Sequence, residues 1–330
     1  MASTSGKSAA RPVISVVILC YNLESFIADC LQSVISQDVN VPFEVIVGDD
    51  GSTDKSVDVV ESFCSRYPGV VKLIRHEHNV GYSRNLADVI EVTSGEYIAT
   101  IDGDDMMLPG KLAVQLEFLE TQREFGMVVH KMRTVNALTN EPAYFPLPRA
   151  KPPVFGAEYL IEYGPFFLNS SAMFRASLRK RYPVNLELKV VADVANLMQS
   201  CYGTQARYLD EELGVYRVNP KGFTSTVITN PARHETNVSD MLCTCTMAET
   251  LGMHKTVVDR GRARLLLVSA ILYLERAHYA EFERCIASSV HFARIGAKQT
   301  VLYALRRWPH VLHSLYTLAK QMAGRQVVRV

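Results

Sequence analysis

The sequence predicts an α/β fold: a mixed, mainly parallel sheet with helices on both faces, followed by a helical C-terminal region. Three observations predict it. Short apolar, β-branched segments alternate with segments of helical period from residue 13 to residue 130. The apolar segments have no polar face, which is typical of parallel strands covered on both sides. From residue 235 onward, nearly every segment has helical periodicity.

The elements are expected in a regular order. The first part alternates as strand 13–19, helix 24–36, strand 43–48, helix 54–66, strand 70–75, helix 83–92, strand 97–101, helix 109–120 and strand 127–130. Next come a proline-rich, loop-rich stretch at 136–165, strands near 170–175 and 206–218, and a helix near 192–202. The last helices are expected at 235–250, 256–276, 279–294 and 300–324. We therefore divide the chain into a flexible tail (1–12), a main domain (13–230) and a helical region (231–330).

Composition is that of a folded globular protein. The chain is 48% hydrophobic and 21% charged, with a formal net charge of +1, so its charge points to no nucleic-acid partner. Seven scattered cysteines without a CxxC pair favour a reducing, cytoplasmic location. The most apolar late stretch, Leu265–Leu274, is shorter than the roughly 20 residues that cross a bilayer. We expect no membrane-spanning segment.

Polar clusters follow three of the expected strands. They are Cys20-Tyr21-Asn22, Asp49-Asp50-Gly51-Ser52-Thr53-Asp54 and Asp102-Gly103-Asp104-Asp105. In an open α/β sheet, ligands bind at the carboxyl ends of the strands, so these clusters are candidates for one site. Asp54 is explained as a helix cap, but Asp49 and Asp50 exceed what a turn requires. A carboxylate at this place can accept hydrogen bonds from a nucleotide base or a ribose.

The third cluster is a candidate metal site. Its three carboxylates, Asp102, Asp104 and Asp105, lie within four residues and repel one another unless a cation or several donors compensate them. Mg²⁺ or Mn²⁺ takes oxygen ligands and is commonly shared between one or two carboxylates and substrate phosphates. The alternative is a solvated turn before a helix, where acidic residues are also favoured. A second candidate metal pair, His76 and His78, more simply flanks a nucleotide loop.

These motifs together resemble the N-terminal half of family 2 glycosyltransferases, which have the GT-A fold, a Rossmann-like nucleotide-binding fold. The resemblance covers about 100 residues, and its strength is the order and spacing of all the motifs. Leu19-Cys20 departs from the pattern, because Pro-Thr or Pro-Val is frequent there. The matching series is Val16-Val17-Ile18-Leu19-Cys20-Tyr21-Asn22, Asp49-Asp50-Gly51-Ser52-Thr53-Asp54, Asn79-Val80-Gly81-Tyr82-Ser83-Arg84-Asn85, Ser94-Gly95-Glu96-Tyr97-Ile98 and Asp102-Gly103-Asp104-Asp105.

The resemblance implies roles for single residues in binding the nucleotide sugar. Tyr21 would flank the base, with Leu19 and Asn22 in the same motif, and Asp49 or Asp50 would bond the base. Asn79 and Arg84 would help to hold the nucleotide; a guanidinium also suits a diphosphate, although a surface arginine at a helix start is the alternative. Asp102, Gly103 and Asp104 would form the DxD motif, with Asp104 as the direct metal ligand. The main domain would divide into a nucleotide-sugar half (13–131) and an acceptor half (132–230).

The second half contains a candidate general base. Transfer with inversion needs a base facing the acceptor hydroxyl, and a carboxylate is the usual choice. The family supplies it at the start of a helix, which in this chain matches Asp193, although Ala192 stands where Glu is frequent. A plain helix-terminal carboxylate is the alternative reading of Asp193, and Glu187 and the acidic run Asp210-Glu211-Glu212 are rival candidates.

A later segment resembles the Tyr-Arg motif of the family. It runs from Val215 to Ser225 and makes Arg217, Lys221 and Ser225 candidate diphosphate contacts. Asn219 stands where His is frequent, which puts any metal or phosphate role of that position in doubt.

The C-terminal helices combine basic and apolar residues. No acidic residue follows Glu283, whereas eight Lys and Arg residues lie beside Trp308, Leu312, Leu315, Tyr316 and Leu318. Such a helix suits the surface of an anionic membrane, and a solvated face of a packed helix is the alternative. Membrane contact would fit a lipid-linked acceptor.

The sequence thus leads to one functional hypothesis and two rivals. The hypothesis is a metal-dependent, inverting glycosyltransferase that uses Mg²⁺ or Mn²⁺ and moves one sugar, from a UDP-sugar by preference, to a glycan or lipid-linked acceptor in cell-surface glycan assembly. A nucleotidyltransferase would be expected to have a Gly-rich loop after the first strand, where this chain has Cys20-Tyr21-Asn22. A non-catalytic sugar-nucleotide-binding protein would not need Asp193. The sequence does not specify an oligomeric state.

Overall fold

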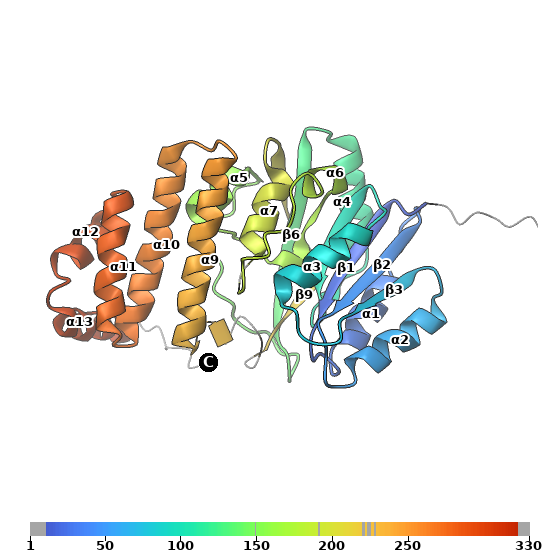
Figure 1. Cartoon of the computed structure of the whole chain (residues 1–330), viewed down its shortest axis with the longest axis horizontal. Coiled ribbons are helices and arrows are strands. Elements are labelled where there is room, and N and C mark those ends of the chain that lie inside the picture. Colours follow the sequence, from blue (N-terminus) through green and yellow to red (C-terminus); the bar gives the residue numbers. More distant parts are fainter. Residues whose placement is uncertain are drawn as a thin grey trace, which may run out of the picture. The chain divides into compact units, whose positions relative to one another are not determined.

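The computed structural model describes residues 11–148, 150–190, 192–219, 222, 226–227 and 229–322. The chain forms two compact units (Figure 1). The first comprises residues Met1–Gly156, Phe166–Glu187 and Gln199–Asn219, and the second comprises Ala157–Pro165, Leu188–Met198 and Pro220–Val330. Each unit is built from segments that are distant in the sequence, so tertiary packing and not chain continuity defines it.

The first unit contains a nine-stranded sheet. Its strands are β1 (Ile14–Cys20), β2 (Phe43–Asp49), β3 (Val71–Arg75), β4 (Tyr97–Asp102), β5 (Met106–Met107), β6 (Phe125–Asn136), β7 (Val154–Phe155), β8 (Met173–Arg175) and β9 (Gln205–Val218). Their order is β3-β2-β1-β4-β8-β6-β9-β5, with β7 paired to β9. β3, β2, β1 and β4 are mutually parallel, and β8 runs antiparallel to both β4 and β6. The predicted mixed, mainly parallel sheet is confirmed.

Helices cover both faces of this sheet. They are α1 (Ile27–Ile35), α2 (Ser56–Arg66), α3 (Tyr82–Val92), α4 (Lys111–Thr121) and α6 (Ala176–Arg179), and a short 3₁₀ turn, η1 (Asn169–Ser171), precedes β8. Alternate residues of β1, such as Val16 and Ile18, pack with α1, α2 and α4 in one fully apolar core. On the opposite face, α3 approaches β2 so closely that a Cβ on Gly48 would lie 2.5 Å from the Val89 side chain. This two-sided burial explains why the strands lack a polar face.

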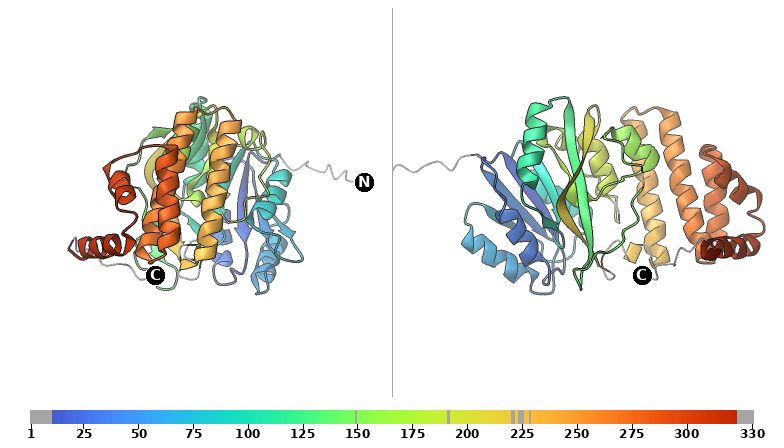
Figure 2. Two further views of the ribbon diagram at one scale, coloured as in Figure 1. Left: turned by 60° about the vertical axis from the view of Figure 1, so that its left-hand side comes forward. Right: turned by 180° about the vertical axis from the view of Figure 1, so that it is seen from behind.

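The second unit is helical (Figure 2). It contains α5 (Ala157–Tyr163), α9 (Pro231–Thr250), α10 (Lys255–Glu275), α11 (Tyr279–Phe292), α12 (Ala297–Ala304) and α13 (Pro309–Met322), while α7 (Asp193–Cys201) begins in this unit and ends in the first. Side chains of α9 to α13 form a second apolar core. Gly261 of α10 permits close packing on α5, because a Cβ there would lie 2.3 Å from the Ile161 carbonyl oxygen.

Two predictions about elements were wrong in detail. The single helix expected at 300–324 is two helices, α12 and α13, that are separated before Pro309. Proline lacks the main-chain N–H that would continue a helix, and it disfavours helical geometry at the preceding residue. The strand expected at 127–130 extends to Asn136 as β6, because its polar second half pairs with β9. Among the described residues, no helix is long and apolar enough to cross a membrane.

Candidate active site

The carboxyl ends of β1, β2 and β4 lie side by side. In the register of the sheet, Leu19 is paired with Asp102 and Cys20 with Asp49. The three polar clusters predicted from the sequence therefore meet at one edge of the first unit. Parallel strands in this order place their carboxyl ends together, which is where α/β proteins bind ligands.

The first two clusters hold each other in place. The Asn22 side chain accepts a hydrogen bond from the Thr53 amide at 2.8 Å, and the Asn22 amide donates to the Ser52 hydroxyl at 2.9 Å. Asp49, fully buried, accepts bonds from the amide and the hydroxyl of Ser52. Asn22 and Asp49 thus shape the loops around the site. Tyr21 lies between the last residue of β1 and Asn22, and it is 47% exposed. Its ring is therefore available to stack on a ligand.

Asp50 connects the end of β2 to the loop before α3. Its carboxylate accepts hydrogen bonds from the amides of Val80 at 2.7 Å and Gly81 at 3.1 Å. Burial raises the pKa of Asp50, while these two amides act in the opposite direction. The contact holds the exposed Asn79 beside Asp50. Arg84 is also exposed, at the surface of α3, where its Nε donates to Asp88 of the same helix at 3.0 Å.

The third cluster forms an acidic loop after β4, at residues 102–105. Asp102 accepts a bond from the Asn169 side-chain amide at 3.3 Å. No side chain among the described residues donates to the carboxylate of Asp104. Burial, together with the neighbouring charge of Asp102, raises the pKa of Asp104 to about 6. A Cβ on Gly103 would lie 2.9 Å from the Leu19 carbonyl oxygen, so only glycine fits between the two aspartates without displacing the loop.

Asp105 has a different environment from its neighbours. It is fully buried, and it accepts bonds from the Ser170 hydroxyl and from the Arg217 amide at 3.0 Å. Burial, with the charges of Asp104 and Asp102, raises the pKa of Asp105 well above its ordinary value. Asp105 therefore fastens the acidic loop to η1 and β9 and does not face a ligand.

The turn η1 holds the acidic loop through hydrogen bonds of Ser170. This role of η1 was not identified in the sequence analysis. Besides its bond to Asp105, the Ser170 hydroxyl accepts from the Asp102 amide at 3.0 Å. Lys111, fully buried at the start of α4, donates to the carbonyls of Ser170 at 2.8 Å and Thr100 at 3.3 Å. Burial lowers the pKa of Lys111 to about 7, although Cys30, Asp105 and Asp102 oppose this shift. A lysine at the start of a helix resembles any surface lysine in sequence, so no local signal could have identified it.

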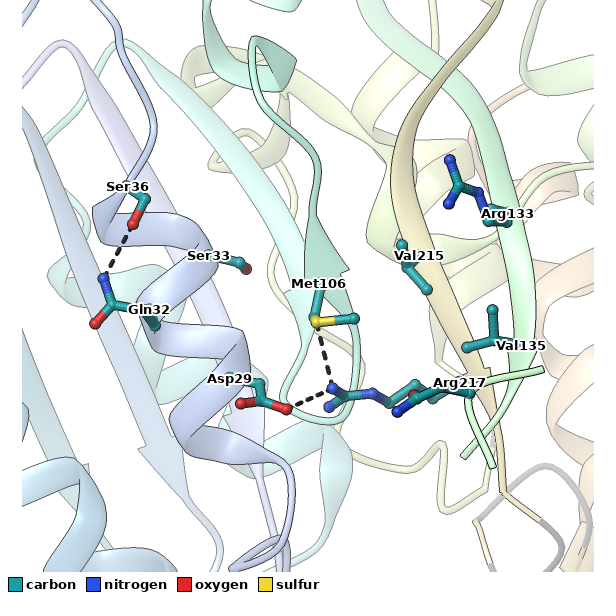
Figure 3. Close-up of a pocket in the computed structure, with 10 residues that line it drawn as sticks. Asp29, Gln32, Ser33, Ser36, Met106, Arg133, Val135, Val215 and Arg217 are labelled. Atoms are coloured by element: carbon teal, nitrogen blue, oxygen red, sulfur yellow. Dashed lines mark hydrogen bonds and ion pairs between the residues drawn. The ribbon is translucent and has the colours of Figure 1, made fainter. Parts of the chain in front are cut away.

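Arg217 of β9 lies beside Asp29 and Met106 (Figure 3). Its side chain is only 5% exposed and forms an ion pair with Asp29 of α1 at 2.6 Å. The same guanidinium donates to the Asp104 carbonyl at 3.4 Å and to the Met106 sulfur at 3.2 Å. In this structure the guanidinium therefore links α1 to the main chain of the acidic loop.

A groove with a volume of about 550 Å³ adjoins this ion pair. Figure 3 shows Asp29 and Gln32 on α1 at one wall and Arg133 and Arg217 at the other. Arg133 is paired with Glu212, as is Lys131. Of the residues predicted to bind the nucleotide sugar, only Arg217 lines this groove, so the groove is distinct from the edge formed by β1, β2 and β4.

The candidate base, Asp193, and the candidate diphosphate contacts Lys221 and Ser225 belong to later parts of the sequence than the acidic loop. Asp193 is half-buried in the first turn of α7, in the second unit. The segment before it is anchored by Asp240 of α9, which accepts bonds from the amides of Lys189 at 2.9 Å and Val190 at 2.6 Å. Lys221 and Ser225 lie outside the described residues.

A family comparison decides the relationship of the chain. The description "Glycosyl transferase family 2" matches residues 15–179, which is half of the chain. The chain belongs to this family.

Individual relatives match parts of this family 2 chain. The uncharacterized protein Rv1520 of Mycobacterium tuberculosis is 33% identical over 123 residues, 37% of this chain and 36% of that protein. A poly(ribitol-phosphate) beta-glucosyltransferase of Bacillus spizizenii is 27% identical over 180 residues, 54% of this chain and 27% of that protein. The chain thus matches 36% and 27% of the length of these two relatives.

Two solved structures share the GT-A fold of this family 2 chain. S. aureus TarS 1-349 in complex with UDP-GlcNAc has a TM-score of 0.67 at 16% identity, over 95% of this chain and 93% of that chain. The mannosyltransferase PcManGT from Pyrobaculum calidifontis, in complex with GDP-Man and Mn²⁺, has a TM-score of 0.56 at 16% identity, over 96% and 89% of the two chains. At such identity the likeness establishes the fold.

The acidic loop offers oxygen ligands of the kind that suit a divalent cation. Asp104 offers a carboxylate to which no described side chain donates, and Asp102, which is held by Asn169, lies two residues before it. Within the part of the chain that the structure describes, no three His, Cys, Asp or Glu side chains are grouped so that they could hold a metal ion. A cation here would therefore share one or two carboxylates with phosphate oxygens of a substrate, as Mg²⁺ commonly does.

Proposed function

We propose that this chain is an inverting glycosyltransferase that moves a single sugar from a nucleoside diphosphate sugar to an acceptor hydroxyl. The observation that carries the proposal is the acidic loop, in which Asp104 lacks a side-chain donor beside the anchored Asp102 at the shared end of β1, β2 and β4. Membership of glycosyl transferase family 2 and the fold shared with sugar-nucleotide complexes support it.

In this proposal the nucleotide lies across the ends of β1 and β2. The exposed Tyr21 stacks on the base, and Asp50 and Asn79 lie at the polar edge of the base. Leu19, Asn22 and Asp49 shape the loop around it. We propose a UDP-sugar as the preferred donor, because the TarS structure holds UDP-GlcNAc. The proposal assigns the diphosphate to Arg84, which is exposed at the start of α3, because a guanidinium suits a diphosphate.

The departing diphosphate requires charge compensation. Mn²⁺ or Mg²⁺, held by Asp104 and Asp102, would neutralise the diphosphate as it leaves. Arg217 keeps the acidic loop close to α1 through Asp29, so that the two carboxylates stay in place. A pre-organised loop costs no rearrangement at the moment of reaction.

Asp193 is the proposed general base. The acceptor oxygen forms a bond to the anomeric carbon, the bond from that carbon to the diphosphate oxygen breaks, and the acceptor proton passes to the Asp193 carboxylate. We propose a glycan or lipid-linked acceptor at the cytoplasmic face of a membrane and a role in cell-surface polysaccharide or other glycan assembly.

A binding experiment tests the donor half of the proposal. UDP, dTDP and GDP are titrated by calorimetry with and without Mn²⁺, and Asp104→Asn is compared with Asp38→Asn, a change of an exposed aspartate away from the acidic loop. We expect Mn²⁺-dependent binding of one nucleotide, lost in Asp104→Asn and kept in Asp38→Asn. Binding that is independent of both the metal and Asp104 would contradict the metal site.

A turnover experiment tests the catalytic half. Release of nucleoside diphosphate from the matching sugar donor is measured with acceptor extracts, and products are identified by mass spectrometry. We expect Asp193→Asn to abolish transfer while nucleotide affinity is retained, and Glu187→Gln and Asp210→Asn to leave transfer intact. Full transfer by Asp193→Asn would remove the proposed base.

A further inference from the structure

The outer faces of α12 and α13 carry exposed apolar side chains. Val301 and Leu305 lie one helical turn apart at the end of α12, and Trp308 follows in the link. Val311, Leu315 and Leu318 share one face of α13, because they are spaced at i, i+4 and i+7. All six side chains are between 36% and 60% exposed. We call these six residues the apolar face.

An adjacent side of each helix is anchored in the second unit. Leu302 of α12 and Leu312 of α13 are buried in the helical core with Phe282 and Leu274. Leu312 had been grouped with the membrane-facing residues in the sequence analysis, and its burial corrects that assignment. The apolar face is therefore presented by packed helices, and apolar side chains gathered at a surface generally mark a binding site.

The part of the sequence that carries the apolar face is basic. Between Arg284 and Val330 the sequence has no acidic residue. Arg294 lies before α12 and Lys298 lies within it, and both are exposed. No carboxylate among the described residues forms an ion pair with either. Arg306 stacks on Tyr303 at 3.9 Å. Arg307 and Arg284 have acidic partners, Glu283 at 3.3 Å and Glu235 at 2.8 Å.

We propose that the apolar face and its basic surroundings bind the surface of an anionic lipid bilayer. Apolar side chains that enter the headgroup region beside Lys and Arg are the pattern of interfacial helices, and no described helix is suited to span the membrane. A second copy of the chain is a poorer occupant, because a symmetric interface would bring like charges together. This inference does not depend on the transfer reaction.

The protein contains a built-in reporter for this contact. Trp308 is the single tryptophan of the chain, and it lies in the apolar face with 60% of its side chain exposed. The full chain is mixed with vesicles of phosphatidylcholine alone or of equal parts phosphatidylcholine and phosphatidylglycerol. We expect a blue shift of the Trp308 emission with the anionic vesicles, together with co-sedimentation that weakens as salt is added.

Variants separate the apolar and the basic contributions. Leu315→Asp should abolish co-sedimentation, whereas Val268→Asp, a matched change at an exposed apolar residue of α10 (66% exposed), should not alter it. Arg294→Gln and Lys298→Gln should each weaken binding about fivefold. Circular dichroism of each variant checks that the helices remain folded.

Three results would overturn the inference. They are an unshifted Trp308 emission with anionic vesicles, equal binding to neutral vesicles, and equal loss of binding in Val268→Asp and Leu315→Asp. A blue shift without lipid that grows with protein concentration, matched by a dimer in light scattering, would assign the apolar face to a second copy instead.

Discussion

The ion pair between Asp29 and Arg217 should act on donor binding through the acidic loop. Arg217→Met keeps the apolar stem of the side chain and removes the guanidinium. The lost Asp29 bond is worth about 1 kcal/mol, because the Asp29 side chain is 61% exposed. The bonds to the Asp104 carbonyl at 3.4 Å and the Met106 sulfur at 3.2 Å together add about 1 kcal/mol. We expect the free energy of unfolding to fall by about 2 kcal/mol in total.

A double-mutant cycle separates positioning from direct contact. Unfolding in urea and calorimetric titration of UDP with Mn²⁺ are measured for Arg217→Met, Asp29→Ala and the double variant. If Arg217 acts by holding the loop, both single variants weaken nucleotide binding, and the double variant is no worse than the poorer single one. The expected coupling in stability is about 1 kcal/mol.

A neighbouring pair provides the control. Arg133 lines the same groove and pairs with Glu212 at 3.4 Å, but it does not contact the acidic loop. Arg133→Met should therefore change nucleotide affinity little. The reasoning would be refuted if Arg217→Met weakened UDP binding while Asp29→Ala left it unchanged, because the guanidinium would then contact the donor itself.

Three further changes probe the acidic loop. Ser170→Ala leaves the buried Asp105 without a hydroxyl donor, so urea unfolding should show a loss of about 2 kcal/mol; an unchanged midpoint would contradict the support by η1. Gly103→Ala brings a Cβ to 2.9 Å from a main-chain oxygen of β1 and should lower Mn²⁺-dependent nucleotide affinity, whereas wild-type affinity would show that the loop can yield. Because the pKa of Asp104 is raised to about 6, Mn²⁺ affinity should fall about tenfold per pH unit below that value, and a flat profile between pH 7 and pH 5 would exclude Asp104 as a ligand. The same raised pKa stabilises the metal-free fold below the unfolded pKa, near 3.9, and this contribution is lost as the pH rises through about 6.

Most of the sheet region could be predicted from local sequence. β1, β2 and β4 are mainly apolar on both faces, and each following helix has a single apolar side, so the period of the pattern distinguishes the two. Where an element has mixed polarity, the prediction failed. The second half of β6 is polar and becomes a strand only because β9 pairs with it. Pro309 is a local signal for the break between α12 and α13, and the helical periodicity on both sides obscured it.

Some residues of the candidate site could be predicted from the sequence, and others could not. Tyr21, Asp102 and Asp104 follow directly after strands, so the sequence alone could place them at the ligand-binding edge of the sheet. The roles of Asp105, Asp29 and Lys111 could not be found in this way. Asp105 is adjacent to Asp104 in sequence, yet it points into the core toward Ser170. Asp29 and Lys111 lie on helices, where an acidic or basic residue has no distinctive pattern.

The sequence by itself determined the class of fold, the family and the cluster of carboxylates after β4, because periodicity and motif order are local properties of the chain. Only the tertiary structure decided which of those carboxylates receives no bond from a described side chain and which is used to hold the loop. It also decided which side of α12 and α13 is buried. These choices depend on contacts between residues as far apart as Asp29 and Arg217, and burial and hydrogen bonding across such distances leave no periodic trace in the sequence.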